Sequence, residues 1–530
     1  MKKNATLLVF ILLIPAFSFS QAFEWAYSTE VSYNLNPALP VNMVCASDAG
    51  LAYTVYFNGD KFEYGSDMYG TDKLDCYNNS GTLQWTLNLG TRTLAQRIVA
   101  DENGNVYIGG TFMKSLVING SDTIENTGGN FSVNLFLVCI DAEGNLVWKR
   151  NVSVDHSNYY GIEALTFDQQ GNLWYAASDF GSSGIYKVDE SGNDLTSYTL
   201  QGSKVLGGIS FDSQGNLFVS GATTAPSLTV VDLEVSVPET YMMYVARINA
   251  AGAGSWAQLA SDITFQRPMV KADPSGNAFV SGNLMSPTSF GAISFLKPQW
   301  VYDVFLTRVD SNGNFLWGVQ APQDPGGITG DFMRGVNSFM DVDDNGNVYL
   351  TGTTRGSLDW GNGVISDAGS LIYGAITVME FDQNGSALWA KNGGSSEFNQ
   401  ASAVDVNGLG ESYFSGSMTG TALFDTIVVN TGGDFASVIG KISTAVATDV
   451  TTPDGPSILV YPNPVDNLLH LSSAINDSRI KIFDATGKCI RDFVPAMNSD
   501  IDVSSLGEGI YLLQSEKGNE IQQARFVVIK

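Results

Sequence analysis

Apolar and polar residues alternate along most of this chain in short runs that are separated by a recurring polar turn. In IVADENGNVYIGGTF, residues 98–112, an apolar run leads into Asp-x-x-Gly-Asn, and a second apolar run follows. The pattern predicts a β-hairpin, because glycine adopts the positive φ of such a turn and the aspartate side chain bonds the turn backbone. Five copies and two degenerate ones, 44 to 70 residues apart, are centred on Asp101, Asp168, Asp212, Asp273, Asp343, Ser47 and Asn407.

A second glycine turn of the same kind follows within most repeats, with a tryptophan four residues after the glycine. Gly192 keeps this turn but lacks the tryptophan, and the complete pairs are Gly81 with Trp85, Gly144 with Trp148, Gly252 with Trp256, Gly313 with Trp317 and Gly385 with Trp389. Two hairpins give four antiparallel strands per repeat. Seven such units predict an all-β fold, a seven-bladed β-propeller over residues 21–443.

The last repeat lacks its fourth strand, and the beginning of the mature chain offers a replacement. The segment AFEWAYSTE carries Trp25 and matches the outer strands LQWTLNLG and ALWAKNGG. We therefore expect residues 22–29 to pair with the third strand of the seventh repeat, Ala436–Ile442. This pairing would close the ring and remove an open sheet edge.

Both ends of the chain depart from the repeat pattern. Residues 1–20 have two lysines, an apolar core and small residues before Gln21, which predicts a secretory signal peptide. That core is shorter than the ~20 residues of a membrane-spanning helix, so the mature chain is expected to have no transmembrane segment. Residues 444–457 read as a linker, and the short alternating strands of residues 458–530 predict a small β-sandwich.

Acidic residues outnumber basic ones 54 to 27, giving a formal net charge of −27. A surface of this sign repels phosphate, so binding to nucleic acid or to anionic membranes is not expected. The charge serves either solubility or the binding of cations, and composition does not decide between them. The four cysteines, Cys45, Cys76, Cys139 and Cys489, are expected to be free and buried, since strand geometry places Cys45 and Cys76 beyond disulfide reach.

The carboxyl-terminal segment resembles the type A sorting domain of the bacterial type IX secretion system, through VYPNP, IFDATGK and DVSSLGEGIYLL. The matching motif residues are Pro462, Asn463, Pro464, Gly487, Lys488, Gly507, Gly509 and Tyr511. The resemblance implies that the type IX machinery recognises this domain at the outer membrane of a Gram-negative bacterium. It also implies a secreted or surface-attached product, with the domain often removed by cleavage, here in the linker.

The repeats themselves, for example DENGNVYIGGTF followed by NLFLVCIDAEGNLVW, are similar to bacterial SBBP (seven-bladed propeller) repeats over residues 43–445. The similarity implies a fold and no particular chemistry.

No catalytic motif, cofactor or metal site is predicted. His156 and His470 are the only histidines, and His156 stands outside any nucleophile motif. The acids from Asp341 to Asn345 copy the start of an EF-hand loop, but its twelfth position is Gly352, so they are interpreted as turn formers. The repeats also lack the C-x-x-C-H motif of a haem site.

The variable loops lie on one face, formed by the connections between the second and third strands and between successive repeats. Ligands bind on such loops, so this face and the mouth of its channel are the expected site. The candidate residues mix aromatic rings with charge, as sugars or peptide ends require, and are Arg97, Tyr159, Tyr160, Arg267, Asp331 and Arg334.

Three functions remain open. The first is an exported binding or adhesion protein for a glycan or peptide. The second is a carbohydrate-active hydrolase or lyase that uses carboxylates at the channel mouth, for example Glu163 and Asp331. The third is a rigid spacer without a pocket.

Overall fold

The computed structural model consists of two compact units, Met1–Ala445 and Val446–Lys530, which are described separately. It describes residues 21–29, 42–64, 67–129, 132–179, 181–261, 267–284, 287–296, 303–322, 330–444, 460–461, 463, 465–471, 478–484, 488–494, 500–507, 509–517 and 520–529. The predicted signal peptide and nearly all of the predicted linker lie outside these residues.

The architecture is all-β, and the single helical turn among the described residues is the 3-10 helix η1 (Val152–Val154). Within this part of the chain, no helix has the length and apolar character needed to cross a membrane.

Each sequence repeat folds into antiparallel strands that pair in chain order. In repeats one to four these strands are β2 (Asn42–Ala46), β3 (Leu51–Tyr64), β4 (Asp67–Asn78) and the start of β5 (Leu83–Ala100); the end of β5, β6 (Val106–Met113), β9 (Val133–Ile140) and β10 (Leu146–Asn151); β11 (Gly161–Phe167), β12 (Leu173–Ser178), β13 (Ser182–Val188) and β14 (Asp194–Gln201); and β15 (Ser203–Phe211), β16 (Leu217–Thr223), β19 (Met242–Ile248) and β20 (Gly254–Ser261).

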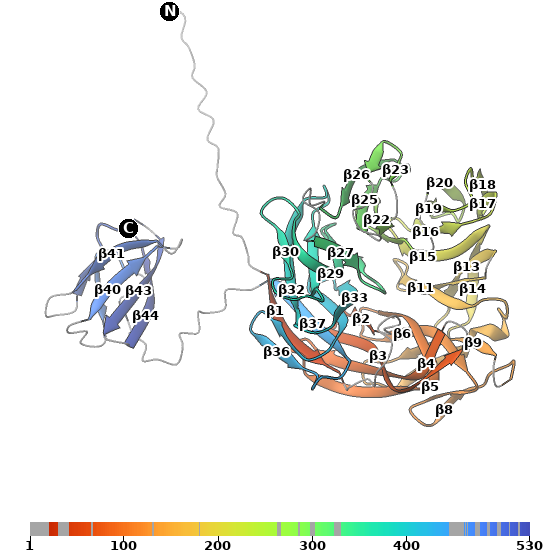
Figure 1. Ribbon diagram of the computed structural model, residues 1–530, viewed down its shortest axis with the longest axis horizontal. Coiled ribbons are helices and arrows are strands. Elements are labelled where there is room, and N and C mark those ends of the chain that lie inside the picture. The colour runs from red at the N-terminus through yellow and green to blue at the C-terminus, as the bar shows by residue number, and fades with distance from the viewer. Residues whose placement is uncertain are drawn as a thin grey trace, which may run out of the picture. The chain divides into compact units, whose positions relative to one another are not determined.

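In repeats five to seven the strands are β21 (Met269–Ala272), β22 (Ala278–Leu284), β25 (Asp303–Val309) and β26 (Phe315–Gln320); β27 (Gly330–Arg334) with β28 (Met340–Val342), β29 (Val348–Asp359), β31 (Ala375–Phe381) and β32 (Ala387–Ser395); and β33 (Asn399–Val406), β34 (Ser412–Met418), β37 (Ala436–Thr444) and β1 (Gln21–Ser28). In Figure 1, β11, β27 and β33 lie toward the middle of this unit, while β8, β18, β30 and β36 lie toward its rim.

Short additional strands occupy the connections between the second and third strands of several repeats. They are β7 (Leu116–Ile118), β8 (Asp122–Ile124), β17 (Ser227–Val230), β18 (Leu233–Ser236), β23 (Thr288–Phe290), β24 (Ile293–Phe295), β30 (Ile365–Asp367), β35 (Thr421–Phe424) and β36 (Ile427–Asn430). Two of these hairpins join neighbouring repeats, because β17 pairs with β14 and β35 pairs with β32.

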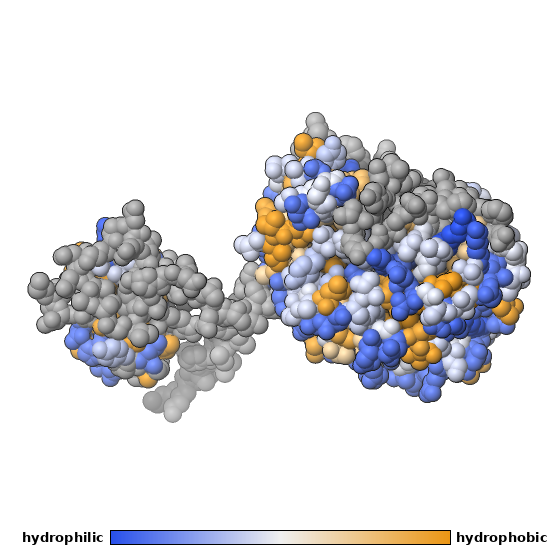
Figure 2. Space-filling view, turned by 90° about the horizontal axis from the view of Figure 1, so that it is seen from below, coloured by the Kyte–Doolittle hydropathy of each residue, from blue (hydrophilic) through white to orange (hydrophobic). Residues whose placement is uncertain are grey.

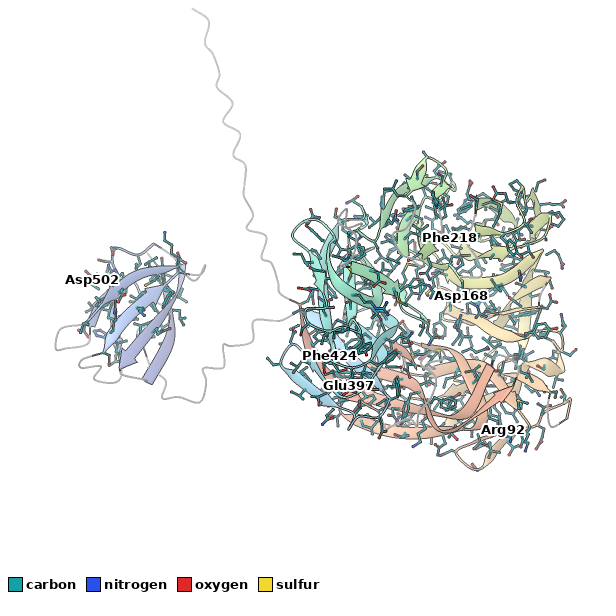
Figure 3. The ribbon with its side chains drawn as sticks, in the orientation of Figure 1. Arg92, Asp168, Phe218, Glu397, Phe424 and Asp502 are labelled. Carbon is teal, nitrogen blue, oxygen red and sulfur yellow. The ribbon has the colours of Figure 1, made fainter. Side chains whose placement is uncertain are left out.

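The repeated aspartates form the turns, as the sequence predicts. Asp343 Oδ1 accepts hydrogen bonds from the backbone N–H groups of Asn345, at 3.0 Å, and Asn347, at 2.8 Å. Asp168, labelled in Figure 3, makes the same two contacts with the residues two and four positions later. Gly346 supplies the positive φ of the turn, 78°. The interpretation of these acids as turn formers is confirmed.

Most of the repeat tryptophans join successive repeats, whereas the Trp389 indole donates to Glu380 of its own repeat. The Trp85 indole donates a hydrogen bond to the Ala142 carbonyl at 2.9 Å, and its ring lies against Gly144 in the next repeat. Trp256 and Trp317 dock in the same way, on the Ser311 and Gln383 carbonyls. In the repeat without a tryptophan, the ring of Tyr198 takes this place beside Gly252.

The amino-terminal strand completes the last repeat, so this predicted pairing is confirmed. β1 pairs antiparallel with β37, with Trp25 opposite Lys441. The Trp25 indole donates to the Asn79 carbonyl of repeat one at 3.0 Å, and its ring covers Gly81. Phe23 packs edge-on against Phe424, which Figure 3 labels.

A buried lysine holds the same junction together. The Lys441 side chain is 2% exposed, and its ammonium lies 2.6 Å from Glu411 Oε1 and 2.9 Å from Glu24 Oε2. It also bonds the Asn79 side chain. Because these partners come from β1, from the seventh repeat and from the first, the amino-terminal strand is tied to both of its neighbours.

The first strand of each repeat contacts the first strand of the next. These contacts join β2 to β5, β5 to β11, β11 to β15, β15 to β21, β21 to β28, β28 to β33 and β33 to β2. Two cavities lie along this line of first strands.

The carboxyl-terminal unit consists of two sheets around one core. One sheet has β38 (Val460–Tyr461), β39 (Leu468–Leu471) and β42 (Asp500–Asp502), and the other has β40 (Arg479–Phe483), β41 (Cys489–Phe493), β43 (Gly509–Lys517) and β44 (Glu520–Val528). Leu469 and Ile501 of the first sheet belong to the same buried cluster as Ile480, Leu513 and Phe526 of the second.

All four cysteines are free, and Cys45, Cys76 and Cys139 are buried, as expected. The expectation was wrong for Cys489, which is exposed. It begins β41, an edge strand of its sheet, whose residues are all exposed or half-buried.

Candidate functional site

Three of the predicted ligand residues meet at one cavity on the inner line of strands. The cavity has a volume of about 200 Å³ and is lined by Arg97, Gly207, Arg267, Met269, Arg334, Val336, Asn337 and Ser338. The arginines come from repeats two, five and six. We call this space the arginine cavity.

Arg97 is held by neutral backbone groups. It lies in the second half of β5, and its Nε donates to the Glu163 carbonyl oxygen at 2.5 Å. Its Nη1 donates to the carbonyl of Gln96, also at 2.5 Å. These contacts fix the guanidinium in the cavity without neutralising its charge.

Arg267 forms the ion pair of the cavity. Its Nη1 lies 2.5 Å from Glu163 Oε2, and its side chain is 42% exposed while that of Glu163 is 6% exposed. Glu163 belongs to β11, the first strand of repeat three. The pair therefore links two repeats that are not neighbours in the sequence.

Arg334 ends β27 and is half-buried. It donates a hydrogen bond from Nη1 to the Gly335 carbonyl at 2.8 Å, and its guanidinium lies 4.7 Å from the centre of the Phe339 ring. A cation over an aromatic face is favourable, but the ring carries no formal charge.

The three guanidinium groups disfavour one another's charge. Desolvation, followed by repulsion from Arg267, lowers the pKa of Arg97 to about 10, although Glu163 opposes this. The pKa of Arg334 is lowered to about 10 by the same two causes. A pKa of about 10 leaves Arg97 and Arg334 charged near neutral pH, so the cavity gathers positive charge in a chain whose net charge is −27.

The other three predicted ligand residues lie elsewhere. The Tyr159 hydroxyl lies 2.7 Å from the Tyr186 hydroxyl, and Tyr160 is 60% exposed. Asp331 faces Arg355 across the β27–β29 pair, with 3.7 Å between Asp331 Oδ2 and Arg355 Nη1. Desolvation raises the pKa of Asp331, and Arg355 opposes the rise. Ligand binding by these three residues stays a prediction.

His156 lies between η1 and β11, in the connection that leads into repeat three. Its Nε2 is 2.8 Å from Asp194 Oδ2, and its ring packs 4.4 Å from the Tyr186 ring. Asp194 also accepts from Arg150 and Tyr175. The surroundings of His156 are those of a packed structural side chain.

A second cavity, of about 230 Å³, lies at the other end of the same inner strands, where the first turn of each repeat begins. Lys271 and Asp405 line it, and the Lys271 ammonium is 2.7 Å from Asp341 Oδ1. Desolvation and then the Asp341 charge raise the pKa of Asp405. The neighbouring Asp341 and Asp405 outweigh desolvation and raise the pKa of Lys271.

Sequence reasoning missed this charged cluster, although a signal was present. Lys271, Asp341 and Asp405 each stand two residues before the turn-forming residue of their repeats, which are consecutive. In the other repeats the same position holds Cys45, Val99, Thr166 and Ser210. Charged residues at the same position of adjacent repeats predict a charged cluster where the first strands of those repeats meet.

No group of three or more His, Cys, Asp or Glu side chains within the described ranges has the geometry of a metal site.

Of the sorting-motif residues, Asn463, Lys488, Gly507, Gly509 and Tyr511 are described, whereas Pro462, Pro464 and Gly487 lie outside the described residues. Asn463 Oδ1 accepts a hydrogen bond from the Val527 N–H at 2.9 Å, which ties the motif to the last strand. The Tyr511 hydroxyl donates to the Gly507 carbonyl at 2.9 Å. Both contacts shape the fold of this unit.

Comparison with known families identifies the carboxyl-terminal unit. Residues 459–530 match the model of the secretion system C-terminal sorting domain, which confirms the resemblance inferred from the motifs. The match implies handling by a type IX secretion system and, with it, a secreted or cell-surface protein. The SBBP resemblance of the repeats stays a prediction.

Comparison with solved structures finds propeller-like folds. A structure of the Dos1 propeller has a TM-score of 0.41 and 9% sequence identity, and the match covers 80% of this chain and 95% of that one. The WD40 domain of Neurospora crassa Pan2 has a TM-score of 0.34 and 12% identity, with coverage of 67% and 90%. No curated protein matches the sequence significantly.

Proposed function

We propose that this chain is a binding protein, exported by the type IX secretion system, whose ligand enters the arginine cavity. The larger unit is then a seven-bladed β-propeller closed by β1. Support for this count comes from the seven sequence repeats, from the pairing of β1 with β37 and from the contacts between successive inner strands.

The observation that carries the proposal is the convergence of Arg97, Arg267 and Arg334. They are separated in sequence, yet they line one cavity on the face where the variable loops lie. Arginine forms directional hydrogen bonds to carboxylates and to other oxyanions, as recognition of a glycan or a peptide end requires. On the face drawn in Figure 2, hydrophobic patches are separated by hydrophilic residues.

The sorting domain supports a location outside the cell or on the outer surface of a Gram-negative bacterium. In this proposal the signal peptide of residues 1–20 directs the first membrane crossing, and the domain of residues 458–530 the second. Cleavage in the linker, residues 444–457, would release the binding unit.

The contacts of the two carboxylates argue against the hydrolase or lyase. Glu163 is engaged by Arg267 and Asp331 by Arg355. A glycosidase needs its carboxylates on either side of one bond, about 5–10 Å apart. The spacer hypothesis predicts a face without a pocket, and the arginine cavity weighs against it.

The proposal is tested by probing glycan and peptide arrays with the mature chain, residues 21–530. We expect binding that survives EDTA and is lost in Arg267→Ala, because Arg267 reaches from the cavity toward solvent. The matched control is Arg355→Ala, since its side chain is 53% exposed and lies outside the arginine cavity. Equal loss in both variants, or binding that requires calcium, would contradict the site.

A further inference from the structure

We propose that Glu380 and Trp389 form a pH-sensitive contact beside the strands that complete repeat seven: ionised Glu380 holds the Trp389 indole tightly, and protonated Glu380 holds it weakly. Both residues belong to repeat six, Glu380 to β31 and Trp389 to β32, and they lie opposite each other in that strand pair. The inference goes beyond the proposed binding function, because neither residue lines the arginine cavity.

One position on the third strand carries a cation in four of the repeats. It lies opposite an aromatic residue of the second strand and is occupied by Lys187, Arg247, Arg308 and Lys441. Each cation faces an acid at the first turn of its own repeat. Arg308, for example, lies 2.5 Å from Asp273, and Lys441 lies 2.6 Å from Glu411. The cation therefore offsets the charge of the turn acid.

Repeat six has a carboxyl group at this position. Glu380 lies opposite the aromatic residue Tyr349 of the second strand, as the cations do in their repeats. Glu380 and the turn acid Asp343 are each 6% exposed. Neither acid forms an ion pair within the part of the chain that the structure describes. Residues 445–459, which follow β37, contain no lysine or arginine. Two buried acids thus face each other where other repeats have an acid and a base.

The basic side chains of the neighbouring elements are engaged by other acids. Arg308 reaches the second turn of repeat six, but its charge is paired with Asp273. Lys441 of repeat seven lies between two glutamates, and Lys391 of β32 pairs with Asp425. Since buried charge is costly without a counter-charge, proton binding is the means by which the pair of acids in repeat six loses its repulsion.

The hydrogen bonds of Glu380 respond to its charge. The Trp389 indole donates to Glu380 Oε2, and the side chains of Tyr349 and Asn347 also donate to this carboxyl group. Burial raises the pKa of Glu380 to about 7; the bond from Trp389 opposes the rise, and the Asp343 charge adds to it. A hydrogen bond to a carboxylate is roughly twice as strong as one to a neutral acceptor. Protonation near pH 7 therefore weakens the hold on Trp389.

The position of Trp389 gives this contact its place in the fold. The docking tryptophans bond a carbonyl in the second turn of the next repeat, as Trp317 does. In repeat seven the third and fourth strands, β37 and β1, come from the end and the beginning of the unit, and no turn joins them. Trp389 packs instead on the cluster that contains Phe23 of β1 and Ile442 of β37, and β32 contacts β1. The charge of Glu380 thus acts where β1 completes repeat seven.

The experiment follows the tryptophans of the mature chain, residues 21–530, by fluorine NMR after labelling with 5-fluorotryptophan. A local signal is needed because Asp72, another buried acid, has its pKa raised to about 8 and also changes global stability with pH. The Trp389 resonance is assigned by its absence in Trp389→Phe. We expect it to shift between pH 5 and pH 9 with a midpoint at about 7, and to be independent of pH in Glu380→Gln.

The Trp317 resonance, assigned with Trp317→Phe, is the control within the same spectra. The Trp317 indole donates to the backbone carbonyl of Gln383, which does not titrate, so its resonance should keep its position. A shift of both resonances with one midpoint would contradict a contact specific to Glu380.

Asp343→Asn tests the second acid and decides the case if Glu380→Gln does not fold. Asn407 fills the same turn position in repeat seven, where its Oδ1 accepts both turn N–H groups, so the variant should keep the turn. Removal of the Asp343 charge should lower the midpoint of the Trp389 resonance. A Trp389 resonance that does not titrate in the wild type, or that titrates unchanged in either variant, would overturn the inference.

Discussion

Asp72 is a fully buried carboxyl group on β4 whose protonation is coupled to folding. Its Oδ2 accepts a hydrogen bond from the Ala95 N–H at 2.7 Å. Desolvation nevertheless raises the pKa of Asp72 to about 8, far above the ~3.9 of an unfolded chain. The folded state therefore binds this proton more tightly than the unfolded state does.

The sign of the pH effect follows from linkage. The contribution of the protonated Asp72 is complete below about pH 4 and is lost as pH rises toward about 8, by at most ~1.4 kcal/mol per pH unit. In Asp72→Asn the neutral amide keeps an acceptor for Ala95, so this decline should be absent. Urea unfolding of both chains at pH 5 and pH 8 measures the difference.

The control for Asp72 is Glu190→Gln, which removes an exposed carboxylate in a turn. It should follow the wild-type profile. If the free energy of unfolding changed with pH in the same way for wild type and Asp72→Asn, Asp72 would be ionised in the folded protein at these pH values.

The candidate site shows what residue patterns reveal and what they leave out. Arg97, Arg267 and Arg334 all stand before the turn-forming residue of their repeats, on the first strand or just ahead of it, and repeat symmetry brings these segments together. Tyr159 and Tyr160 come from the same kind of connection. Their direction depends on the loop around η1, where Tyr159 turns to Tyr186. Loop geometry of this kind follows from tertiary contacts that no local pattern encodes.

At the scale of the element, β1 supplies the fourth strand of the seventh repeat and contacts the first repeat. Trp25 lies on this strand, is 5% exposed, and docks on the turn of repeat one in the way that Trp85 docks on the turn of repeat two. We expect Trp25→Ala to lower the free energy of unfolding by about 3–5 kcal/mol, the usual cost of removing a buried aromatic side chain. Scanning calorimetry or urea unfolding followed by circular dichroism gives this value.

An exposed aromatic serves as the control for Trp25. Tyr160→Ala removes a ring that is 60% exposed and should change stability by less than ~1 kcal/mol. If Trp25→Ala were as mild as this control, β1 would contribute little to the junction with repeat one.

The strands of the repeats were predictable because their turns are spelled out in the sequence. Asp101, Asp141 and their counterparts bond the turn backbone locally, so five residues suffice to define each hairpin. The hairpins between the second and third strands, such as β17–β18 and β35–β36, were not predicted. Their pairing with β14 and β32 of the preceding repeats is a tertiary contact, and their turns place Val231 and Asp425, rather than glycine, at positive φ.

At the scale of the whole molecule, the proposed binding site and the sorting domain lie in separate units. Each unit has its own buried core, and the arginine cavity is lined by residues of the first unit alone. The sorting domain is matched by residues 459–530 alone. A change in one function should therefore leave the other intact.

Export supplies the test of this division. In a Gram-negative host with a type IX system, deletion of residues 459–530 should leave the chain in the periplasm, because the outer-membrane machinery has lost the domain it recognises. Cell fractionation with detection of the larger unit measures the outcome. Arg267→Gln, altered only in the arginine cavity, should reach the medium or the cell surface at the wild-type level. The intact mass of the exported wild-type chain should end within residues 444–457. Arrival of the truncated chain outside the cell at wild-type level would show that the tail is not its export signal.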